Sequence, residues 1–258
     1  MKRTLLHTPP EGLPQNILDF IGSSSIYDSS CSREARVYFI DRDGGFYLKK
    51  SPKSTLSLEA KMTEYFHSKG LGTEVISYIS DDCDYMLTRR IAGEDCTHKC
   101  YLDDPCRLCD TLATRLRMLH ETDFTDCPVT DRMGAYLALA EKNFQNGLFD
   151  LSYFQEAQSA QEAYAVLQNG KSALKNEVLI HGDYCLPNVM LDAWSFSGFI
   201  DVGNGGVGDR HVDLFWGAWT LNFNLGTDKY RERFLDAYGR DKVDTDKLRI
   251  IAAAEVFG

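Results

Sequence analysis

The stretch HGDYCLPN, residues 181–188, lies between two apolar, β-prone segments and carries an acid and an amide five residues apart. A carboxylate such as Asp183 can accept the proton of an attacking hydroxyl and hold that hydroxyl in line with a γ-phosphate. Asn188 offers a neutral oxygen ligand to Mg²⁺, a hard cation that prefers octahedral oxygen coordination. An Asp followed five residues later by an Asn on a loop is typical of phosphoryl-transfer enzymes. The competing interpretation is a plain β-turn, in which Asp and Asn are common.

A second acid, Asp201, ends the short β-prone segment 197–201 and is followed by Gly203. A glycine at this place lets the backbone turn sharply at the end of a strand. An Asp in this setting is suited to hold Mg²⁺ against the β- and γ-phosphates of a nucleotide. The Asp-x-Gly pattern alone is weak evidence, because it also marks ordinary turns.

A lysine and an acid complete the set. Lys49 ends a predicted strand, and Glu59 lies ten residues on in a predicted helix. A kinase needs a lysine on the α- and β-phosphates and an acid that holds it. Unit charges about 4 Å apart attract by roughly 4 kcal/mol at an effective dielectric of about 20, before desolvation is subtracted. Lys50 is the competitor, but strand alternation puts it on the opposite face from Lys49; each lysine could also be a solvated surface residue.

The first part of the chain reads as strand-rich. Segments 37–40 and 46–49 flank the turn signal DRDGG, and further strands are predicted at 74–78 and 85–88. A helix is predicted over 59–69, with Gly70 as its terminator. Helical patterns then dominate: 106–120, 131–147, 153–168, 229–239 and 247–257. The pattern indicates an α+β protein with a small β-rich N-terminal lobe, residues 1–90, and a larger, mainly helical C-terminal lobe, residues 91–258.

Composition bounds the partners. The chain has 258 residues, 43% of them hydrophobic and 26% charged, which is ordinary for a globular protein. No signal peptide and no stretch of about 18 uncharged residues is present, so we expect a cytoplasmic protein without a membrane partner. The net charge of −10 disfavours nucleic acid and suits a cationic small molecule, although it also simply aids solubility. We expect a monomer or a weak dimer.

The cysteines raise one alternative, a zinc site. Five candidate ligands gather in one short segment: Cys96, His98, Cys100, Cys106 and Cys109. Against this, residues 106–120 read as an amphipathic helix with a leucine stripe, and Cys109 lies near that stripe as a small buried hydrophobe. No second CxxC pair completes a four-ligand set. The helical interpretation is therefore favoured.

The motifs together resemble a known family. HGDYCLPN at 181–188, GFIDVG at 198–203, GVGDR at 206–210 and Asp213-Leu214 are similar to the aminoglycoside phosphotransferases, and closest to the aminoglycoside 3′-phosphotransferase branch. The resemblance implies a protein-kinase-like fold with a five-stranded small lobe and a helical large lobe. It also implies transfer of the γ-phosphate of ATP, sometimes GTP, to a hydroxyl of an aminocyclitol antibiotic.

The resemblance also assigns roles. It makes Asp183 the catalytic base, Asn188 and Asp201 the Mg²⁺ ligands, and Lys49 the phosphate-binding lysine held by Glu59. The backbone between Arg89 and Ile91 would hydrogen-bond the adenine. Asp213 would brace the catalytic loop, and His181 would support it.

The chain departs from the family in several places. The segment that corresponds to the nucleotide loop, SSCSREAR at 29–36, has no glycine, so Ser30 and Ser32 would offer hydroxyls and N–H groups to phosphate. Asn204 stands where relatives often carry Arg. Residues 214–226 contain no charge, whereas relatives place charged acceptor contacts there. The aromatic residues of this segment fall on one helical stripe, which predicts core packing rather than stacking on a sugar: Trp216, Trp219 and Phe223.

A cationic acceptor would then be held by acids elsewhere, although each of them is also expected to face solvent. The candidates are Asp150, Glu156, Glu162, Glu255 and the carboxylate after Gly258. Two other functions stay open. The uncharged segment favours a kinase of another small hydroxylated metabolite or antibiotic, and a nucleotide-binding pseudokinase is opposed by the complete set of motif residues.

Overall fold

The computed structural model describes residues 3–31 and 35–258. They form two compact units, Met1–Ala92 with Gly198–Gly203, and Gly93–Ser197 with Asn204–Gly258. The short segment 198–203 joins the first unit because the Phe199 amide donates to the Leu71 carbonyl at 2.7 Å and the Phe199 ring packs edge-on against Phe66. Asp201 therefore belongs to the first unit, although the chain before residue 198 and after residue 203 belongs to the second.

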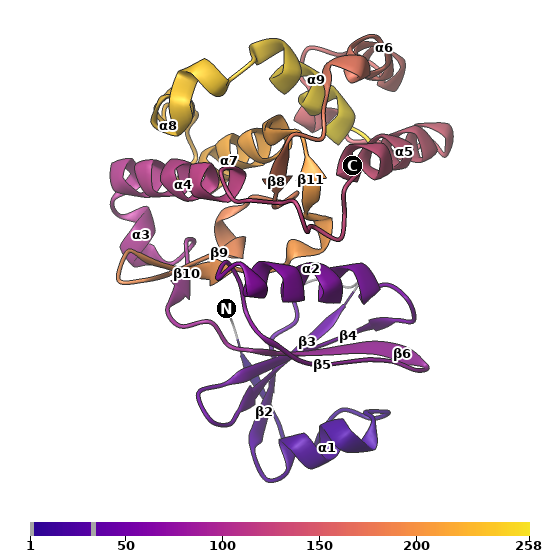
Figure 1. Cartoon of the computed structure of the whole chain (residues 1–258), viewed down its shortest axis with the longest axis vertical. Coiled ribbons are helices and arrows are strands. Elements are labelled where there is room, and N and C mark those ends of the chain that lie inside the picture. Colours follow the sequence, from indigo (N-terminus) through magenta and orange to yellow (C-terminus); the bar gives the residue numbers. More distant parts are fainter. Residues whose placement is uncertain (1–2, 32–34) are drawn as a thin grey trace. The chain divides into compact units, whose positions relative to one another are not determined.

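The first unit is built on one antiparallel sheet of six strands in the order β1-β2-β3-β4-β6-β5 (Figure 1). The strands are β1 Thr4–Leu6, β2 Ser25–Asp28, β3 Arg36–Asp41, β4 Phe46–Pro52, β5 Val75–Ser80 and β6 Cys83–Arg89. The predicted hairpin and the two later strands are confirmed. The sheet has one strand more than the resemblance implied, because β1 pairs with the edge of β2.

Alternation along the central strands sorts their side chains onto two faces. Leu48 of β4 and Leu87 of β6 pack with α1 (Gln15–Ile21) in one apolar cluster. Met86, on the other face of β6, packs with Ala60 of α2 (Ser57–Ser68). Lys49 follows Leu48 in the strand, so it projects toward the face that α2 covers.

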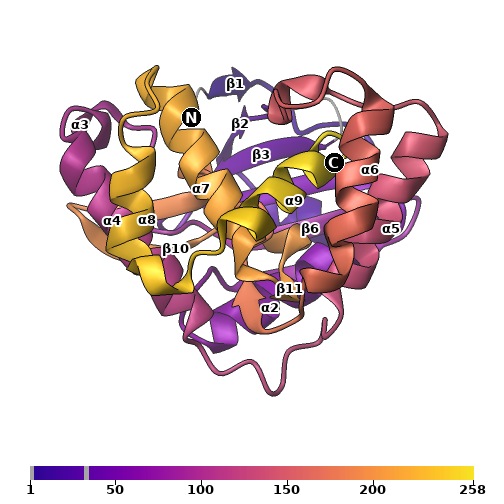
Figure 2. The same ribbon diagram turned by 90° about the horizontal axis from the view of Figure 1, so that it is seen from above.

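The second unit is mainly helical (Figure 2). Its helices are α3 Lys99–Leu102, α4 Pro105–His120, α5 Arg132–Gln145, α6 Ala160–Gly170, α7 Arg210–Leu225, α8 Arg231–Gly239 and α9 Thr245–Glu255. Short strands link them: β7 Glu94–Asp95 and β9 Val189–Asp192 pair antiparallel, as do β8 Val178–Ile180 and β11 Gly206–Gly208. Strand β10, Ser195–Phe199, lies beside β9. Helices α5, α6, α7 and α9 share one apolar core.

One helix begins later than predicted. Residues 153–168 were expected to form a single helix, but Leu151–Tyr153 is a 3-10 turn and α6 begins at Ala160. The reason is a capping box: the Ser159 hydroxyl accepts from the Glu162 amide, and the Glu162 carboxylate accepts from the Gln158 amide. This reciprocal pair fixes the helix start at Ser159.

The remaining expectations concern metals and membranes. Cys109 is buried on α4 with the leucine stripe, as the helical interpretation predicts, and burial raises the pKa of its thiol to about 12. Within residues 3–31 and 35–258, no group of three or more His, Cys, Asp and Glu side chains is placed to hold a metal ion. None of the described helices is long and apolar enough to cross a membrane.

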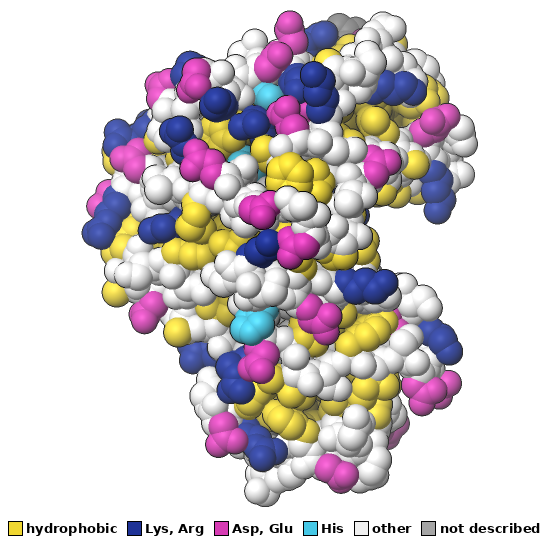
Figure 3. Space-filling model, viewed as in Figure 1, with side chains coloured by type: hydrophobic (Ala, Val, Ile, Leu, Met, Phe, Trp, Pro, Cys, Tyr) yellow, Lys and Arg dark blue, Asp and Glu magenta, His cyan; other side chains and the backbone are white. Residues whose placement is uncertain are grey.

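On the face drawn in Figure 3, acidic and basic side chains are interspersed.

Candidate active site

Lys49 is the centre of a triad of charges in the first unit. Its Nζ lies 2.8 Å from both carboxylate oxygens of Glu59 and 2.9 Å from Oδ1 of Asp201. Glu59 stands in the first turn of α2, above the face of β4 from which Lys49 projects. The ion pair expected from the sequence between Lys49 and Glu59 is therefore present, and Asp201 joins it.

Lys50 points the other way. Its Nζ lies 3.3 Å from the carbonyl oxygen of Glu11 and 5.5 Å from the centre of the Tyr85 ring. Because Tyr85 belongs to the cluster on the α1 face, the strand alternation resolves the competition between the two lysines as predicted.

The opposite charges of the triad stabilise the ionised form of Lys49. Burial alone would lower the pKa of Lys49, but the charges of Asp201 and Glu59 and their hydrogen bonds outweigh it and raise the pKa above its usual value. Burial raises the pKa of Glu59, and the neighbouring Lys49 opposes that rise. Lys49 is thus held as a cation at neutral pH.

Asp201 has an unusual backbone. Its φ is +59°, in the left-handed region that non-glycine residues rarely occupy. The backbone around it is tied to the first unit through Phe199, and Gly203 lies against Glu59, where an added Cβ would come within 3.2 Å of the Glu59 Cβ. Non-glycine residues held in this region concentrate at functional sites. The side chain is 53% exposed.

In the second unit the backbone at the start of the loop 181–188 is hydrogen-bonded to the side chain of Asp213. Oδ2 of this buried carboxylate accepts from the His181 amide at 2.7 Å, and Oδ1 accepts from the Gly182 amide at 2.8 Å. The Asp183 amide in turn lies 3.3 Å from Nδ1 of His181. Asp213 comes from the first turn of α7, so a helix that is packed in the core fixes the loop. This is the bracing contact that the resemblance implied.

Asp183 and Asn188 face each other within the loop. Nδ2 of Asn188 donates to the carbonyl oxygen of Asp183 at 3.0 Å and to its Oδ2 at 2.9 Å. The 3-10 turn Leu186–Asn188 brings the two residues together. This orientation leaves Oδ1 of Asn188 as the atom that can bind a metal ion.

Gly182 and Asn204 meet too closely for any other residue at position 182. Gly182 has φ +81°, and a Cβ there would lie 1.9 Å from the carbonyl oxygen of Asn204. The Asn204 side chain accepts from Nη2 of Arg132 at 2.5 Å. The sequence did not single out Arg132, because it lies on α5, 72 positions away. A guanidinium therefore does lie beside Asn204, the position where relatives often carry Arg, but it comes from another helix.

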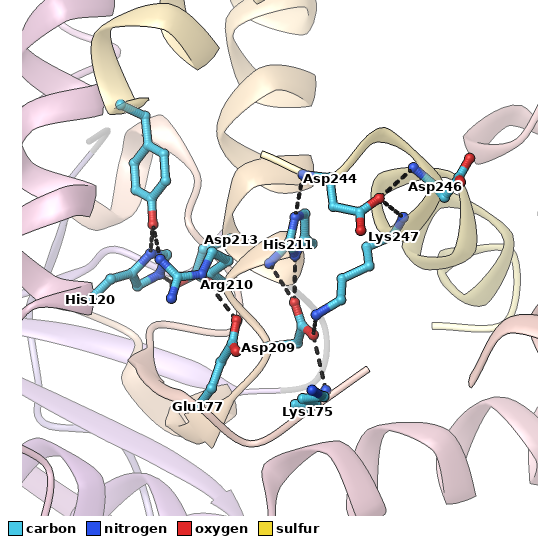
Figure 4. A network of polar contacts seen from close by, with 11 residues as sticks. His120, Lys175, Glu177, Asp209, Arg210, His211, Asp213, Asp244, Asp246 and Lys247 are labelled. Atoms are coloured by element: carbon cyan, nitrogen blue, oxygen red, sulfur yellow. Dashed lines mark hydrogen bonds and ion pairs between the residues drawn. The ribbon is translucent and has the colours of Figure 1, made fainter. Parts of the chain in front are cut away.

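A buried chain of polar groups supports Asp213 from behind (Figure 4). Nε2 of His120 lies 3.1 Å from Oδ2 of Asp213, and its Nδ1 lies 2.8 Å from the Tyr238 hydroxyl. Nη1 of Arg210 donates to the same hydroxyl at 3.2 Å. Burial lowers the pKa of His120, so the ring is neutral, donating to Asp213 and accepting from Tyr238.

A second carboxylate anchors the start of α7 to α9. Asp209 accepts from Nδ1 of His211 at 2.6 Å, from Nζ of Lys247 at 2.9 Å and from the Lys175 amide at 2.9 Å (Figure 4). Burial would raise the pKa of Asp209, but the hydrogen bonds from His211 and Lys247 lower it well below its usual range. The His211 ring also accepts from the Asp244 amide, the cap of α9.

The residues predicted to hold the nucleotide are only partly placed. The Ser30 hydroxyl accepts from the Val37 amide at 3.0 Å, and Ser32 lies outside the described residues. The backbone N–H of Arg89 donates to Glu74, and its carbonyl accepts from the Thr73 hydroxyl. The Arg89 N–H is therefore already paired, and the adenine contact expected from the backbone between Arg89 and Ile91 stays a prediction.

The four acids predicted for the acceptor differ in their surroundings. Asp150 caps the 3-10 turn that follows it, and Glu162 belongs to the capping box of α6. Glu156 pairs with Arg249 at 2.6 Å on the surface. Glu255 was expected to face solvent, and this is wrong, because only 5% of it is exposed.

Glu255 is held by two aromatic donors. Its Oε1 accepts from the Tyr136 hydroxyl at 2.8 Å and from Nε1 of Trp216 at 3.0 Å. Burial raises the pKa of Glu255 to about 7, the two hydrogen bonds oppose the rise, and the charge of Asp183 adds to it. Glu255 therefore lies within electrostatic reach of Asp183.

A sheet-and-helix unit with a Lys–Glu–Asp triad, and a helical unit with a braced Asp–Asn loop, define the protein-kinase-like class of phosphotransferases. A model of the phosphotransferase enzyme family matches residues 31–251. The chain belongs to this family, and the resemblance seen in the sequence is confirmed.

The relatives refine this assignment. The chain is 51% identical to a probable aminoglycoside 3′-phosphotransferase of Lactococcus lactis, over 96% of both chains. It is 28% identical to the aminoglycoside 3′-phosphotransferase of Niallia circulans, over 95% of this chain and 97% of that one. A solved aminoglycoside phosphotransferase from Streptomyces rimosus, in complex with ADP and streptomycin, shares the fold with a TM-score of 0.72 at 23% identity, over 86% of this chain and 90% of that one.

Proposed function

We propose that this protein transfers the γ-phosphate of ATP to a hydroxyl of an aminoglycoside antibiotic, the 3′-hydroxyl, and so inactivates the drug. The observation that carries the proposal is the Asp183–Asn188 pair on a loop whose backbone is fixed by Asp213. The names of the two relatives support the acceptor, and the ADP and streptomycin of the Streptomyces rimosus complex support the nucleotide and the acceptor class.

In this proposal Asp183 is the catalytic base. The acceptor oxygen forms a bond to the γ-phosphorus while the bond from that phosphorus to the bridging oxygen breaks, and ADP leaves with the electron pair. The acceptor proton passes to the Asp183 carboxylate. The hydrogen bond from Asn188 keeps that carboxylate in one orientation, so less conformational freedom is lost when the acceptor binds.

Lys49 is the proposed partner of the α- and β-phosphates. Its ammonium carries the positive charge that phosphate requires, and Glu59 fixes its position. Ser30, Ser32 and the backbone between Arg89 and Ile91 remain proposed contacts for the rest of the nucleotide. GTP would satisfy the same groups.

The residues present also suit Mg²⁺. Oδ1 of Asn188 is turned away from Asp183, and the Asp201 carboxylate is half exposed, so both offer the hard oxygen donors that Mg²⁺ prefers. When bound, Mg²⁺ would neutralise charge on the phosphate oxygens, with Asn188 and Asp201 as its protein ligands. Because ATP is a cytoplasmic donor, the cytoplasmic location expected from the sequence is part of the proposal.

The acceptor is a polycation, so carboxylates should help to bind it. Glu255 is the strongest candidate of the four acids, because it bonds Trp216 of α7, the helix whose Asp213 holds the catalytic loop. Asp150 is a second candidate, since its amide donates to the carbonyl of Val256, the residue after Glu255. Glu156 and Glu162 are weaker candidates because Arg249 and the cap of α6 already engage them.

A second candidate is a kinase of another small hydroxylated metabolite or antibiotic. The uncharged stretch 214–226 favours it, because this segment brings no carboxylate to a polycation. Release of ADP from Mg·ATP in the presence of kanamycin, neomycin, streptomycin and spectinomycin distinguishes the two. We expect turnover with kanamycin and neomycin, lost in Asp183→Asn. Nucleotide binding without turnover on any of the four drugs would favour the second candidate, and absence of nucleotide binding would refute both.

A further inference from the structure

Four aromatic side chains form a continuous row in the second unit, here called the aromatic row: Tyr153, Trp216, Trp219 and Phe223. Tyr153 lies 5.6 Å from Trp216 and 6.0 Å from Trp219 between ring centres. The two tryptophans are 5.3 Å apart and edge-on, and Trp219 stacks on Phe223 at 5.0 Å with an angle of 12°. The last three are spaced along one stripe of α7, so the helix presents their rings in series.

The row extends out of the core. Core packing was expected for this stripe, and Trp216 does lie against the apolar core, half-buried. Trp219 is also only half-buried, and Phe223 is 71% exposed. The expectation is therefore wrong for the outer end of the row. Large aromatic surface left in water by an uncharged stretch such as residues 214–226 is typical of a binding surface.

The row lies beside the catalytic loop. Asp213 and Thr220 of α7 both bind this loop: Asp213 accepts from the His181 and Gly182 amides, and the Thr220 hydroxyl accepts from the Leu186 amide at 3.1 Å. Trp216 and Trp219 stand between these two anchors on the same helix. Trp216 also donates to Glu255, so the inner end of the row adjoins the acid proposed for the acceptor.

The chemistry of the row matches a cationic sugar. Ammonium groups are attracted to the face of an aromatic ring, most strongly to Trp, and the apolar C–H faces of sugar rings also bury well against aromatic rings. A row of ring faces can therefore take the place of the charged contacts that residues 214–226 lack. The alternative occupant, a protein partner, does not explain why the row adjoins Glu255 and the catalytic loop.

We propose that the aromatic row is the acceptor-binding wall of this enzyme, and that it selects acceptors by contacts of Trp219 and Phe223 with their ammonium groups and sugar faces. The inference rests on the proposed function and deepens it, because it names the residues that decide which acceptor is used. The aromatic row also makes the uncharged stretch 214–226 compatible with a polycationic substrate.

The test compares Trp219→Ala, Phe223→Ala and Leu139→Ala. Leu139 is 47% exposed on α5 and lies outside the row, so it is a matched control for loss of exposed apolar area. Binding of kanamycin A is measured by titration calorimetry, and KM and kcat are measured with Mg·ATP. We expect Kd and acceptor KM to rise about 5- to 30-fold in the two row variants, with the KM for ATP unchanged. Trp219→Phe should restore most of the affinity and Trp219→Leu should not.

The outcomes separate this proposal from the proposed function. If the wild type turns over and the row variants bind kanamycin as tightly as Leu139→Ala does, the aromatic row is not the acceptor-binding wall, and the proposed function is unaffected. Binding weakened by the row variants, without turnover in the wild type, supports the wall and counts against the function. A wild type that binds no drug of the panel overturns both.

Discussion

His120 and Asp213, 93 positions apart in sequence, are joined in the interior of the second unit by a hydrogen bond of 3.1 Å. The same carboxylate holds the amides of His181 and Gly182, so an imidazole that touches no reacting atom helps to orient the loop that carries Asp183. Asp213 is fully buried, so each of its oxygens depends on the partners that the fold supplies.

Removal of the imidazole should therefore affect both stability and turnover. In His120→Ala, Asp213 loses a donor and the Tyr238 hydroxyl loses an acceptor. We expect a loss of about 2–4 kcal/mol in the free energy of unfolding, measured by urea denaturation. Tyr238→Phe removes the hydroxyl that bonds His120 and Arg210 but keeps the bond between His120 and Asp213, and it should cost about 1 kcal/mol. Equal losses of unfolding free energy in the two variants would show that His120 does not contribute more than Tyr238 to the support of Asp213.

Lys49 and Lys50 offer a matched pair. Lys49→Met removes the charge beside Glu59 and Asp201, whereas Lys50→Met removes a charge on the other face of β4. We expect kcat/KM for ATP to fall about 100-fold or more in the first variant and less than about 3-fold in the second. ADP release over a range of ATP concentrations measures both. A similar loss from the two variants would show that the site does not use Lys49 specifically.

Glu255 predicts an unusual dependence of stability on pH. Its pKa is raised in the folded state, from 4.5 to about 7, so the folded protein holds a proton that the unfolded chain has already released. The free energy of unfolding should then decrease as pH rises through this window, by an amount on the order of 3 kcal/mol, and level off above it.

Glu255→Gln isolates this effect, because it keeps the shape of the side chain and removes its titration. The difference in stability between wild type and variant, measured by urea denaturation from about pH 4 to about pH 8, should shift in favour of the variant as pH rises. A difference that stays constant across these pH values would show that Glu255 does not titrate in the window.

Substitution of two glycines can distinguish the cost of a steric contact from the cost of a positive φ. Gly182 and Gly147 both have positive φ, +81° and +67°, but only at Gly182 would a Cβ meet a neighbour, 1.9 Å from the Asn204 carbonyl oxygen. Gly147→Ala should cost about 1 kcal/mol of unfolding free energy from its φ alone. Gly182→Ala should cost clearly more and abolish ADP release, because the loop or Asn204 must move. Similar losses would mean that the contact is easily relieved.

Much of the site could be predicted from the sequence because its members lie in short, patterned segments. Asp183 and Asn188 share one loop, and strand alternation separates Lys49 from Lys50. The supporting residues could not be predicted. Arg132 reaches Asn204 from another helix, and Tyr238 reaches His120 across 118 positions, so neither leaves a local pattern.

The aromatic stripe of α7 shows that burial, too, could be predicted only in part from the sequence. Its period along α7 was recognised, but a period does not say which part of a stripe the neighbouring helices cover. The inner residue Trp216 meets the core through α9 and Glu255, and the outer residue Phe223 does not.

The placement of Gly198–Gly203 has a consequence for how such proteins evolve. The chain passes between the two units after residues 92, 197 and 203, so neither unit is a single contiguous piece of gene. Recombination at residue 92 would separate Asp201 from the first unit, to which the hydrogen bond from Phe199 to Leu71, in the loop after α2, ties its segment. A single crossover at residue 92 therefore cannot exchange one unit intact, because each unit takes up two separate stretches of the chain.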